Sequence, residues 1–162
     1  MTTGTKAKAR RRSTSTRRRR ARGLPDDACS TCGTMMERKH GPVSWSVNGE
    51  AIRVPDISHL RCPRCGEGLF SLREAEALRR GAFDIYRTRH RLLSADEIRG
   101  IREQHGLTQA ELARVLRLGG NTLSRWEAGR NVQTAAMDVL LRLVRDLPGI
   151  LEHLREPSPS SG

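Results

Sequence analysis

Two Cys-X-X-Cys pairs constrain this chain of 162 residues more than any other feature of its sequence. Cys29 and Cys32 form the first pair, Cys62 and Cys65 form the second, and 29 residues lie between the pairs. A glycine follows each pair, as is typical of tight turns that direct two sulfur atoms at one ion. Four thiolates complete the tetrahedral shell of zinc and leave no position for an activated water. We therefore expect one structural Zn²⁺ per chain, bound by these four cysteines, and no enzymatic activity.

Other uses of the cysteines fit the sequence less well. A redox role requires a single pair of low thiol pKa at a helix start in a larger fold, whereas iron uses the same ligands and stays open as an alternative. His40 and His59 lie between the pairs, but four thiolates leave them no place at the metal, so we expect them at the surface or behind the ligands. The sequence has no N-terminal apolar segment and no apolar run near the roughly 18 residues of a membrane span. We expect a cytoplasmic, nucleoid-associated protein with reduced cysteines.

The segment between the cysteine pairs has the pattern of a β-hairpin. Apolar and polar residues alternate from 43 to 54 around Asn48-Gly49, a dipeptide that favours a type I′ turn. A two-residue turn sets Val47 opposite Glu50. The next two facing pairs share one side of the hairpin: Trp45 with Ile52, and Val43 with Val54. The sequence therefore predicts a zinc-ribbon-like β module over residues 24–70.

The formal charge of +12 is concentrated near the N-terminus. Residues 1–23 contain two lysines, eight arginines and no acidic residue, whereas residues 92–162 contain nine basic and nine acidic residues. The 1–23 arm has one methionine as its only large apolar residue and cannot bury enough surface to offset the entropy of ordering. We expect it to be disordered and to act either as a solubilising extension or as a phosphate-binding arm on DNA or RNA. A second disordered tail is expected at 156–162.

Capping boxes predict where the helices begin. The motif Ser/Thr-X-X-Glu occurs three times between residues 71 and 111 and predicts helices that start after residues 71, 94 and 108. The first is a helical linker over 71–92. The others belong to an all-α domain over 93–155, whose remaining helices are expected at 121–128, 134–147 and 149–155. The predicted fold class is α+β: a small β module, a helical linker and a five-helix domain.

The five-helix segment resembles the helix-turn-helix domain of the phage-repressor (Cro/CI, Xre) family, on the motifs LTQAELARVL and NTLSRWEAGRN. The order CxxC, hairpin, CPRCGE, helical linker and helix-turn-helix over residues 29–155 resembles the MqsA (YgiT-type) antitoxins of bacterial toxin–antitoxin operons. This resemblance implies a DNA-binding dimer that represses its own promoter through the C-terminal domain. It also implies a partner toxin, in the best-known branch an mRNA-cleaving ribonuclease, bound through the zinc domain. A regulator of the same fold without a toxin, or an RNA-binding zinc-ribbon protein, is the alternative.

The helix at 121–128 is expected to contact DNA bases. Leu123 continues the apolar repeat, Trp126 is expected to pack inside, and Glu127 is expected to form a local ion pair or cap. Four polar residues are left for the exposed face: Asn121, Thr122, Ser124 and Arg125. Asn121 and Arg125 project from the same side of the helix, and Asn suits adenine whereas Arg suits guanine. In the family resemblance these two positions also match the DNA-contacting Asn and Arg.

Thr108, Gln109 and Gly120 are expected to contact DNA phosphates. Thr108 and Gln109 begin the preceding helix, while Gly120, with Gly119, either lets the backbone approach DNA closely or forms a flexible turn.

The apolar surface at 134–147 predicts a homodimer on double-stranded DNA with a palindromic operator. The residues that supply this surface are Thr134, Met137, Leu140, Leu141, Val144 and Leu147.

Overall fold

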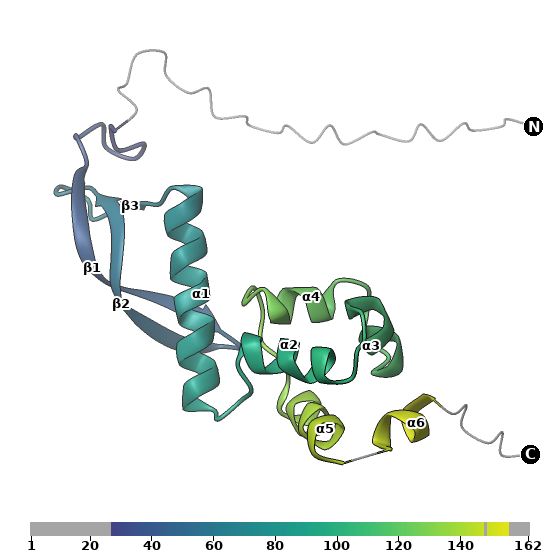
Figure 1. Cartoon of the computed structure of the whole chain (residues 1–162). Coiled ribbons are helices and arrows are strands. Elements are labelled where there is room, and N and C mark those ends of the chain that lie inside the picture. Colours follow the sequence, from purple (N-terminus) through teal and green to yellow (C-terminus); the bar gives the residue numbers. More distant parts are fainter. Residues whose placement is uncertain (1–26, 148, 156–162) are drawn as a thin grey trace, which may run out of the picture.

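The computed structural model describes residues 27–147 and 149–155. A three-stranded antiparallel sheet in the order β1-β2-β3 consists of β1 (Glu37–Val47), β2 (Glu50–Arg61) and β3 (Gly68–Leu69). The helices are α1 (Leu72–Arg89), α2 (Ala95–Gln104), α3 (Gln109–Val115), α4 (Thr122–Glu127), α5 (Ala135–Asp146) and α6 (Ile150–Arg155). The sheet and α1 lie at one end of the molecule and α2 to α6 at the other (Figure 1). The α+β class is confirmed, whereas the predicted arm at 1–23 and tail at 156–162 lie outside the described residues.

The hairpin of β1 and β2 has the predicted register but is longer than predicted. Val47 pairs with Glu50, and the next apolar pairs follow as expected from the alternation. Asn48 and Gly49 have φ angles of 49° and 85°, as a type I′ turn requires. The strands continue to Glu37 and Arg61, well beyond the segment at 43–54 in which residue types alternate.

A bulge explains why the alternation of apolar and polar residues stops at residue 54 although β2 continues to Arg61. Pro55 and Asp56 of β2 lie opposite the single residue Pro42 of β1. Proline has no N–H to donate to a strand ladder, and the extra residue of a bulge accommodates this and bends the strands. The bulge also shifts the phase of burial along the strand. The buried residues of β2 are Ile52, Val54, Ile57 and His59.

Helix α1 covers the hairpin as well as connecting the two ends of the molecule. Its Leu78, Ala82 and Phe83 form one core with the buried apolar residues of the hairpin. A Cβ at Gly81 would lie 3.0 Å from a methyl group of Val54, so glycine permits this close approach of helix and sheet. Leu72, in the first turn of α1, lies outside this core and is 92% exposed.

The helical end has the predicted helix starts. All three capping boxes form, with the hydroxyl and the glutamate each accepting from the other residue's backbone N–H. Helix α4 is followed by Gly129 with φ of 66°, the left-handed conformation of a helix stop. Leu123 and Trp126 lie in the core of this end, as predicted. Within the described part of the chain, none of the helices has the length and apolar character needed to cross a bilayer.

Candidate metal centre and nucleic-acid interface

The four cysteines lie on two loops of the same design. In the first loop the Gly33 N–H donates to the Cys29 carbonyl at 2.8 Å, and in the second the Gly66 N–H donates to the Cys62 carbonyl at 3.0 Å. Both glycines have positive φ, 73° and 76°, a conformation that residues with a Cβ rarely adopt. Each turn therefore depends on the glycine that follows its cysteine pair.

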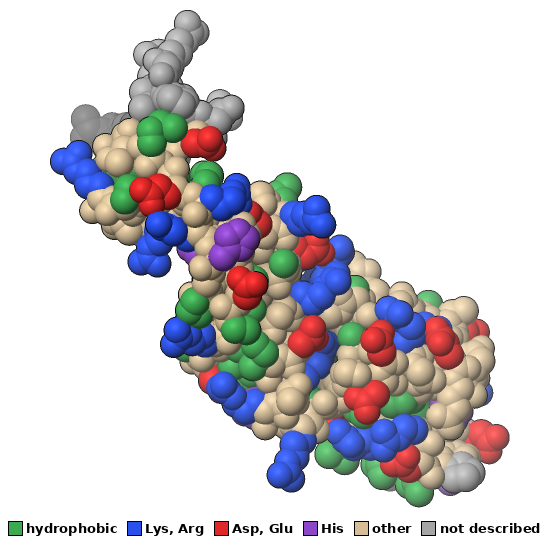
Figure 2. Space-filling model, turned by 60° about the vertical axis from the view of Figure 1, so that its left-hand side comes forward, with side chains coloured by type: hydrophobic (Ala, Val, Ile, Leu, Met, Phe, Trp, Pro, Cys, Tyr) green, Lys and Arg blue, Asp and Glu red, His purple; other side chains and the backbone are tan. Residues whose placement is uncertain are grey.

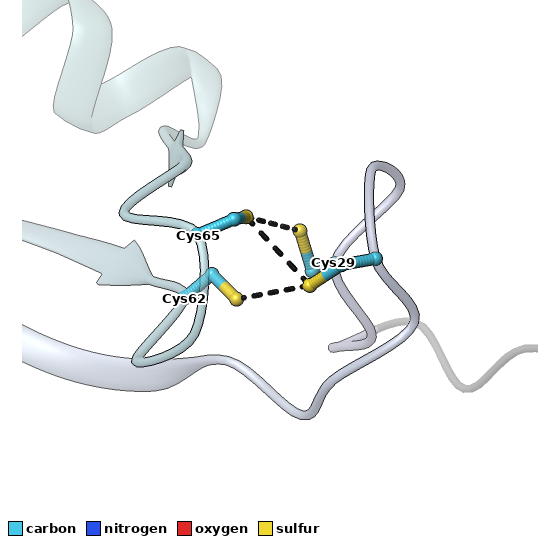
Figure 3. Close-up of side chains that lie close together, drawn as sticks. Cys29, Cys62 and Cys65 are labelled. Carbon is cyan, nitrogen blue, oxygen red and sulfur yellow. Dashed lines mark hydrogen bonds between the residues drawn. The ribbon is translucent and has the colours of Figure 1, made fainter.

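The sulfur atoms of the two loops point toward one another (Figure 3). All four lie within 4.8 Å of one another. The closest separations are 3.4 Å between Cys32 and Cys62, 3.5 Å between Cys29 and Cys65, and 3.6 Å between Cys32 and Cys65. A tetrahedral zinc centre with Zn–S bonds of about 2.3 Å sets its sulfur atoms about 3.8 Å apart. The cluster therefore has the size and donor chemistry to bind one metal ion.

The surroundings shift the thiols of the cluster in different directions, since hydrogen bonds with the other cysteines and burial raise the pKa of Cys65 to about 12. The hydroxyl and backbone amide of Thr34 lower the pKa of Cys32 to about 6, and the thiolate is the form that binds metals. His40 is exposed, whereas His59 is buried and stacks on Phe70 at 5.2 Å between ring centroids. Neither histidine belongs to the group of potential ligands around the cysteines.

Helix α4 has one buried side and one exposed side. Leu123 and Trp126 face the core, whereas Asn121 and Arg125 are exposed. Asn121 is the N-cap residue of α4, yet its side chain makes no capping hydrogen bond. Its amide group therefore remains available to an external partner, one helical turn from the Arg125 guanidinium.

Three of the other expected DNA contacts, Thr108, Gln109 and Ser124, also make hydrogen bonds inside the protein. The Thr108 hydroxyl donates to the Glu111 carboxylate at 2.8 Å within the capping box. The Ser124 hydroxyl donates to the Asn121 carbonyl at 3.0 Å. Ser124 and Thr122 are half-buried, so less of each side chain is accessible than at Asn121.

Glu127 joins α4 to two other helices. It is 2% exposed and accepts from Arg102 of α2 at 2.8 and 3.0 Å and from the Gln109 amide of α3 at 2.9 Å. Burial alone raises the pKa of Glu127, but the hydrogen bonds from Arg102 and Gln109 outweigh it and lower the pKa below its ordinary value. The expected ion pair of Glu127 forms with Arg102, but it is not local, because the partners of Glu127 are 25 and 18 residues away in the chain.

Neither the backbone conformation nor the packing of the turn before α4 requires glycine. Neither Gly119 nor Gly120 has a positive φ. A Cβ at Gly119 would meet only the Thr122 hydroxyl, at 3.7 Å, and a Cβ at Gly120 would meet nothing within 4 Å. The fold would accept a side chain at both positions.

The outer surface of α5 differs from the expected apolar face. Leu141 and Val144 were expected at a dimer surface but are fully buried in the core of their own domain. The large apolar residues that α5 and its C-cap expose are Val139, Leu143 and Leu147. Basic and acidic side chains are interspersed over the face of the molecule seen in Figure 2. This mixture agrees with the near-neutral balance of the chain beyond residue 23.

Comparisons with known proteins match this architecture. The sequence model of the family described as "Antitoxin component of bacterial toxin-antitoxin system, MqsA" matches residues 27–155. A curated relative, Antitoxin HigA-2 of Vibrio cholerae serotype O1, is 41% identical over 64 residues, which are 40% of this chain and 62% of the relative. The chain therefore spans less than two thirds of the length of that relative.

Proposed function

The chain belongs to the MqsA family of antitoxin components of bacterial toxin–antitoxin systems, and on this basis we propose that it represses its own operon by binding the operator through α4. The pair Asn121 and Arg125 carries this proposal. Both side chains are exposed and one turn apart, while the opposite side of α4 is buried. Asn pairs with adenine N6 and N7, and Arg pairs with guanine O6 and N7, in the major groove. One turn of helix thus offers two different base preferences.

Residues around α4 set its position on the DNA. Thr122 and Ser124 contribute further contacts on the same side, and Thr108 and Gln109 place the N-terminus of α3 near a phosphate. The open space around Gly120 supports a close backbone approach to a phosphate, since the protein's own packing gives no reason for glycine there. These contacts fix the register of the protein, whereas Asn121 and Arg125 select the sequence.

The cysteine cluster is proposed to hold Zn²⁺ as a structural ion. Cys29, Cys32, Cys62 and Cys65 would supply all four ligands, so the site has no open position for chemistry. Bound zinc supplies folding free energy, about 10 to 16 kcal/mol in comparable zinc peptides. The four cysteines thereby tie the free ends of the hairpin together.

The same end of the molecule is proposed to bind the toxin. Met35, Leu69 and Leu72 expose large apolar side chains around the cysteine loops and the start of α1. Exposed large apolar side chains at this end are therefore proposed as contacts for a protein partner. The partner implied by the family resemblance is an mRNA-cleaving ribonuclease.

A homodimer through α5 completes the proposal. Val139, Leu143 and Leu147 are spaced by four residues and form one exposed apolar row. A single α4 contacts few base pairs, so two copies on a palindrome, with half-sites about 34 to 36 Å apart, give a more specific site.

The test is a titration of promoter DNA from the chain's own operon against a random duplex of equal length. Asn121→Ala and Arg125→Ala are each expected to weaken operator binding by about 1 to 3 kcal/mol and to leave binding to random DNA nearly unchanged. Arg73→Ala is the matched control, because it removes an exposed arginine from the start of α1. If both α4 variants keep the wild-type ratio of operator to random affinity, these residues do not select the sequence.

A further inference from the structure

The loop that follows α4, residues 128–133, is held by α1 and the hairpin. We propose that Arg87 of α1 is a positioning residue for DNA recognition, which fixes the C-terminal end of α4 so that the metal-binding end and α4 move as one rigid body. This inference rests on the proposed DNA contact through α4. Arg87 lies 39 residues before its partner Trp126 in the chain, and nothing in the local sequence pattern indicates that the two meet.

Arg87 is a buried cation at the end of a helix. Its side chain is 2% exposed, and its Nη2 donates to the carbonyl of Trp126 at 3.1 Å and to the carbonyl of Asn131 at 2.6 Å. Its Nη1 donates to Asp84 at 3.3 Å. The last carbonyls of a helix lack donors within the helix, and a positive charge there is favourable. Arg87 therefore acts as a C-terminal cap of α4 that is supplied by another part of the molecule.

This cap is adjacent to a proposed base contact. Arg125 lies in the last turn of α4, directly before Trp126. The Arg125 carbonyl accepts from the N–H of Arg130 at 2.8 Å, so the loop held by Arg87 closes on the same turn. Because α4 has only six residues, fraying of its last turn would displace the Arg125 side chain.

Apolar and ionic contacts join the same loop to α1. Val132 is buried in the core that the hairpin and α1 form, although it follows α4 in the chain. Gly129 packs against Arg80, with the Arg80 Cγ 3.6 Å from the position of a Cβ at Gly129. Arg130 donates to Glu76 at 3.2 Å. The loop is thus fixed to α1 at three positions besides Arg87.

A buried polar network fixes the chain where it leaves α1. The N–H of Leu93 donates to Asp138 at 2.7 Å, and the Gln133 amide donates to the Leu93 carbonyl at 2.7 Å and to Asp138 at 3.0 Å. Gln133 and Asp138 are 1% and 5% exposed. The connection between α1 and α2 is therefore pinned by the residues that follow α4.

Among the described residues, the two ends of the molecule meet at the loop 128–133 and at the connection from α1 to α2. A cleft of about 550 Å³, lined among others by Arg80 and Asp84 of α1 and by Asp96 and Arg99 of α2, separates these helices beside Arg87. Residues of the loop at 128–133 and of the connection from α1 to α2 also line this cleft. Arg87 is the buried side chain that bonds both the Trp126 carbonyl in α4 and the Asn131 carbonyl in the loop, so its loss is expected to loosen this connection.

The test compares full-length Arg87→Met and Arg87→Lys with Arg73→Met, which changes an exposed arginine of the same helix. Backbone ¹⁵N relaxation measures the tumbling of each part without any DNA. In the wild type and in Arg73→Met, amides of the hairpin and of α2 to α6 should share one rotational correlation time. In Arg87→Met they should separate into two, with faster hydrogen exchange at Gly129 and Arg130. Lysine keeps the charge but has fewer directed donors, so Arg87→Lys should give an intermediate result.

DNA titration supplies a second measurement on the same variants. Arg87→Met is expected to lower the ratio of operator to random affinity about tenfold, within the range of ordinary coupling between sites, while Arg73→Met leaves it unchanged. A single correlation time for Arg87→Met, with unchanged exchange in the loop, overturns the inference, as do two correlation times in the wild type. If Arg87→Met does not fold, Val132→Ala and Arg87→Lys provide the same comparison. A wild type that does not distinguish operator from random DNA contradicts the proposed function. The relaxation result still decides whether the two ends of the molecule move as one rigid body.

Discussion

Replacement of Glu127 by glutamine is expected to remove a large part of the stability of the helical end. The carboxylate is buried and accepts two hydrogen bonds from Arg102 and one from Gln109. Removal of one partner of a buried ion pair costs about 3 to 5 kcal/mol, because the other charge loses its counter-ion. Arg102 is 14% exposed, so water can solvate part of its charge and the lower figure applies, about 3 kcal/mol. Domains of this size have a total stability of about 5 to 15 kcal/mol.

Thermal unfolding followed by far-UV circular dichroism measures this loss. For a domain of this size each kcal/mol corresponds to about 4 to 8 °C, so Glu127→Gln should lower the Tm by about 12 to 24 °C. Glu103→Gln is the matched control, since Glu103 pairs with the same arginine at 3.3 Å but is 60% exposed, and a change within about 0.5 kcal/mol is expected. A Tm of Glu127→Gln within a few degrees of the wild type, by the same scale, would show that the pair does not stabilise the domain.

The pH dependence of stability gives an independent check of the same pair. The pKa of Glu127 is lower in the folded state than its ordinary value. The stability that it contributes is therefore fully present above the unfolded pKa of about 4.3 and is lost as the pH falls through the folded pKa. Glu127→Gln has no such group, so its stability should fall less steeply on acidification than that of the wild type. Equal slopes in both proteins would contradict the assigned ionisation.

Four other perturbations test the remaining parts of the molecule. Cys62→Ser should abolish the metal content of about one ion per chain expected for a closed tetrathiolate site while the helical end stays folded, and full retention of metal in elemental analysis would contradict the site. Gly120→Ala should leave the Tm unchanged or raise stability by up to about 1 kcal/mol and should weaken DNA binding; unchanged affinity would make the turn a simple connection. Leu143→Glu should convert a dimer into a monomer in light scattering, and a monomeric wild type, free and on DNA, would exclude the dimer. Deletion of residues 1–23 should weaken operator and random DNA binding by equal factors and reduce the salt slope by about 0.9 for each lost phosphate contact; an unchanged slope would leave the arm a solubilising extension.

Local patterns in the sequence predicted the local structure well. The Asn48-Gly49 turn fixed the hairpin register, and the three capping boxes fixed three helix starts, because each signal depends on residues within a few positions of one another. The extension of the strands beyond 43–54 was missed, because the local alternation of apolar and polar residues does not continue there. The bulge at Pro55 and Asp56 of β2, opposite Pro42, shifts the phase of the buried residues, so no single alternating pattern spans β2.

Contacts between distant segments were not predictable from these patterns. Arg87, Gln133 and Asp138 are of polar types that are mostly exposed in proteins, yet all three are buried. Each has at least one partner about 40 to 45 residues away in the chain. A single sequence contains no signal for such pairings, because hydrogen bonds between separate elements leave no periodic trace. The dimer surface was also misassigned in part. Periodicity showed that α5 has an apolar side, but it did not show which of its residues the same domain covers.

The proline-containing bulge of the hairpin also bears on solubility. Strand β1 forms one edge of the sheet, and an edge strand of eleven residues presents backbone groups to which another chain can add a strand. Pro42 interrupts this edge near its middle, and the charged side chains of Arg38 and Lys39 occupy its first half. Bends, prolines and edge lysines are the features that prevent strands of different molecules from pairing. The bulge that interrupts the alternating pattern of the hairpin therefore also protects the antitoxin from edge-to-edge aggregation.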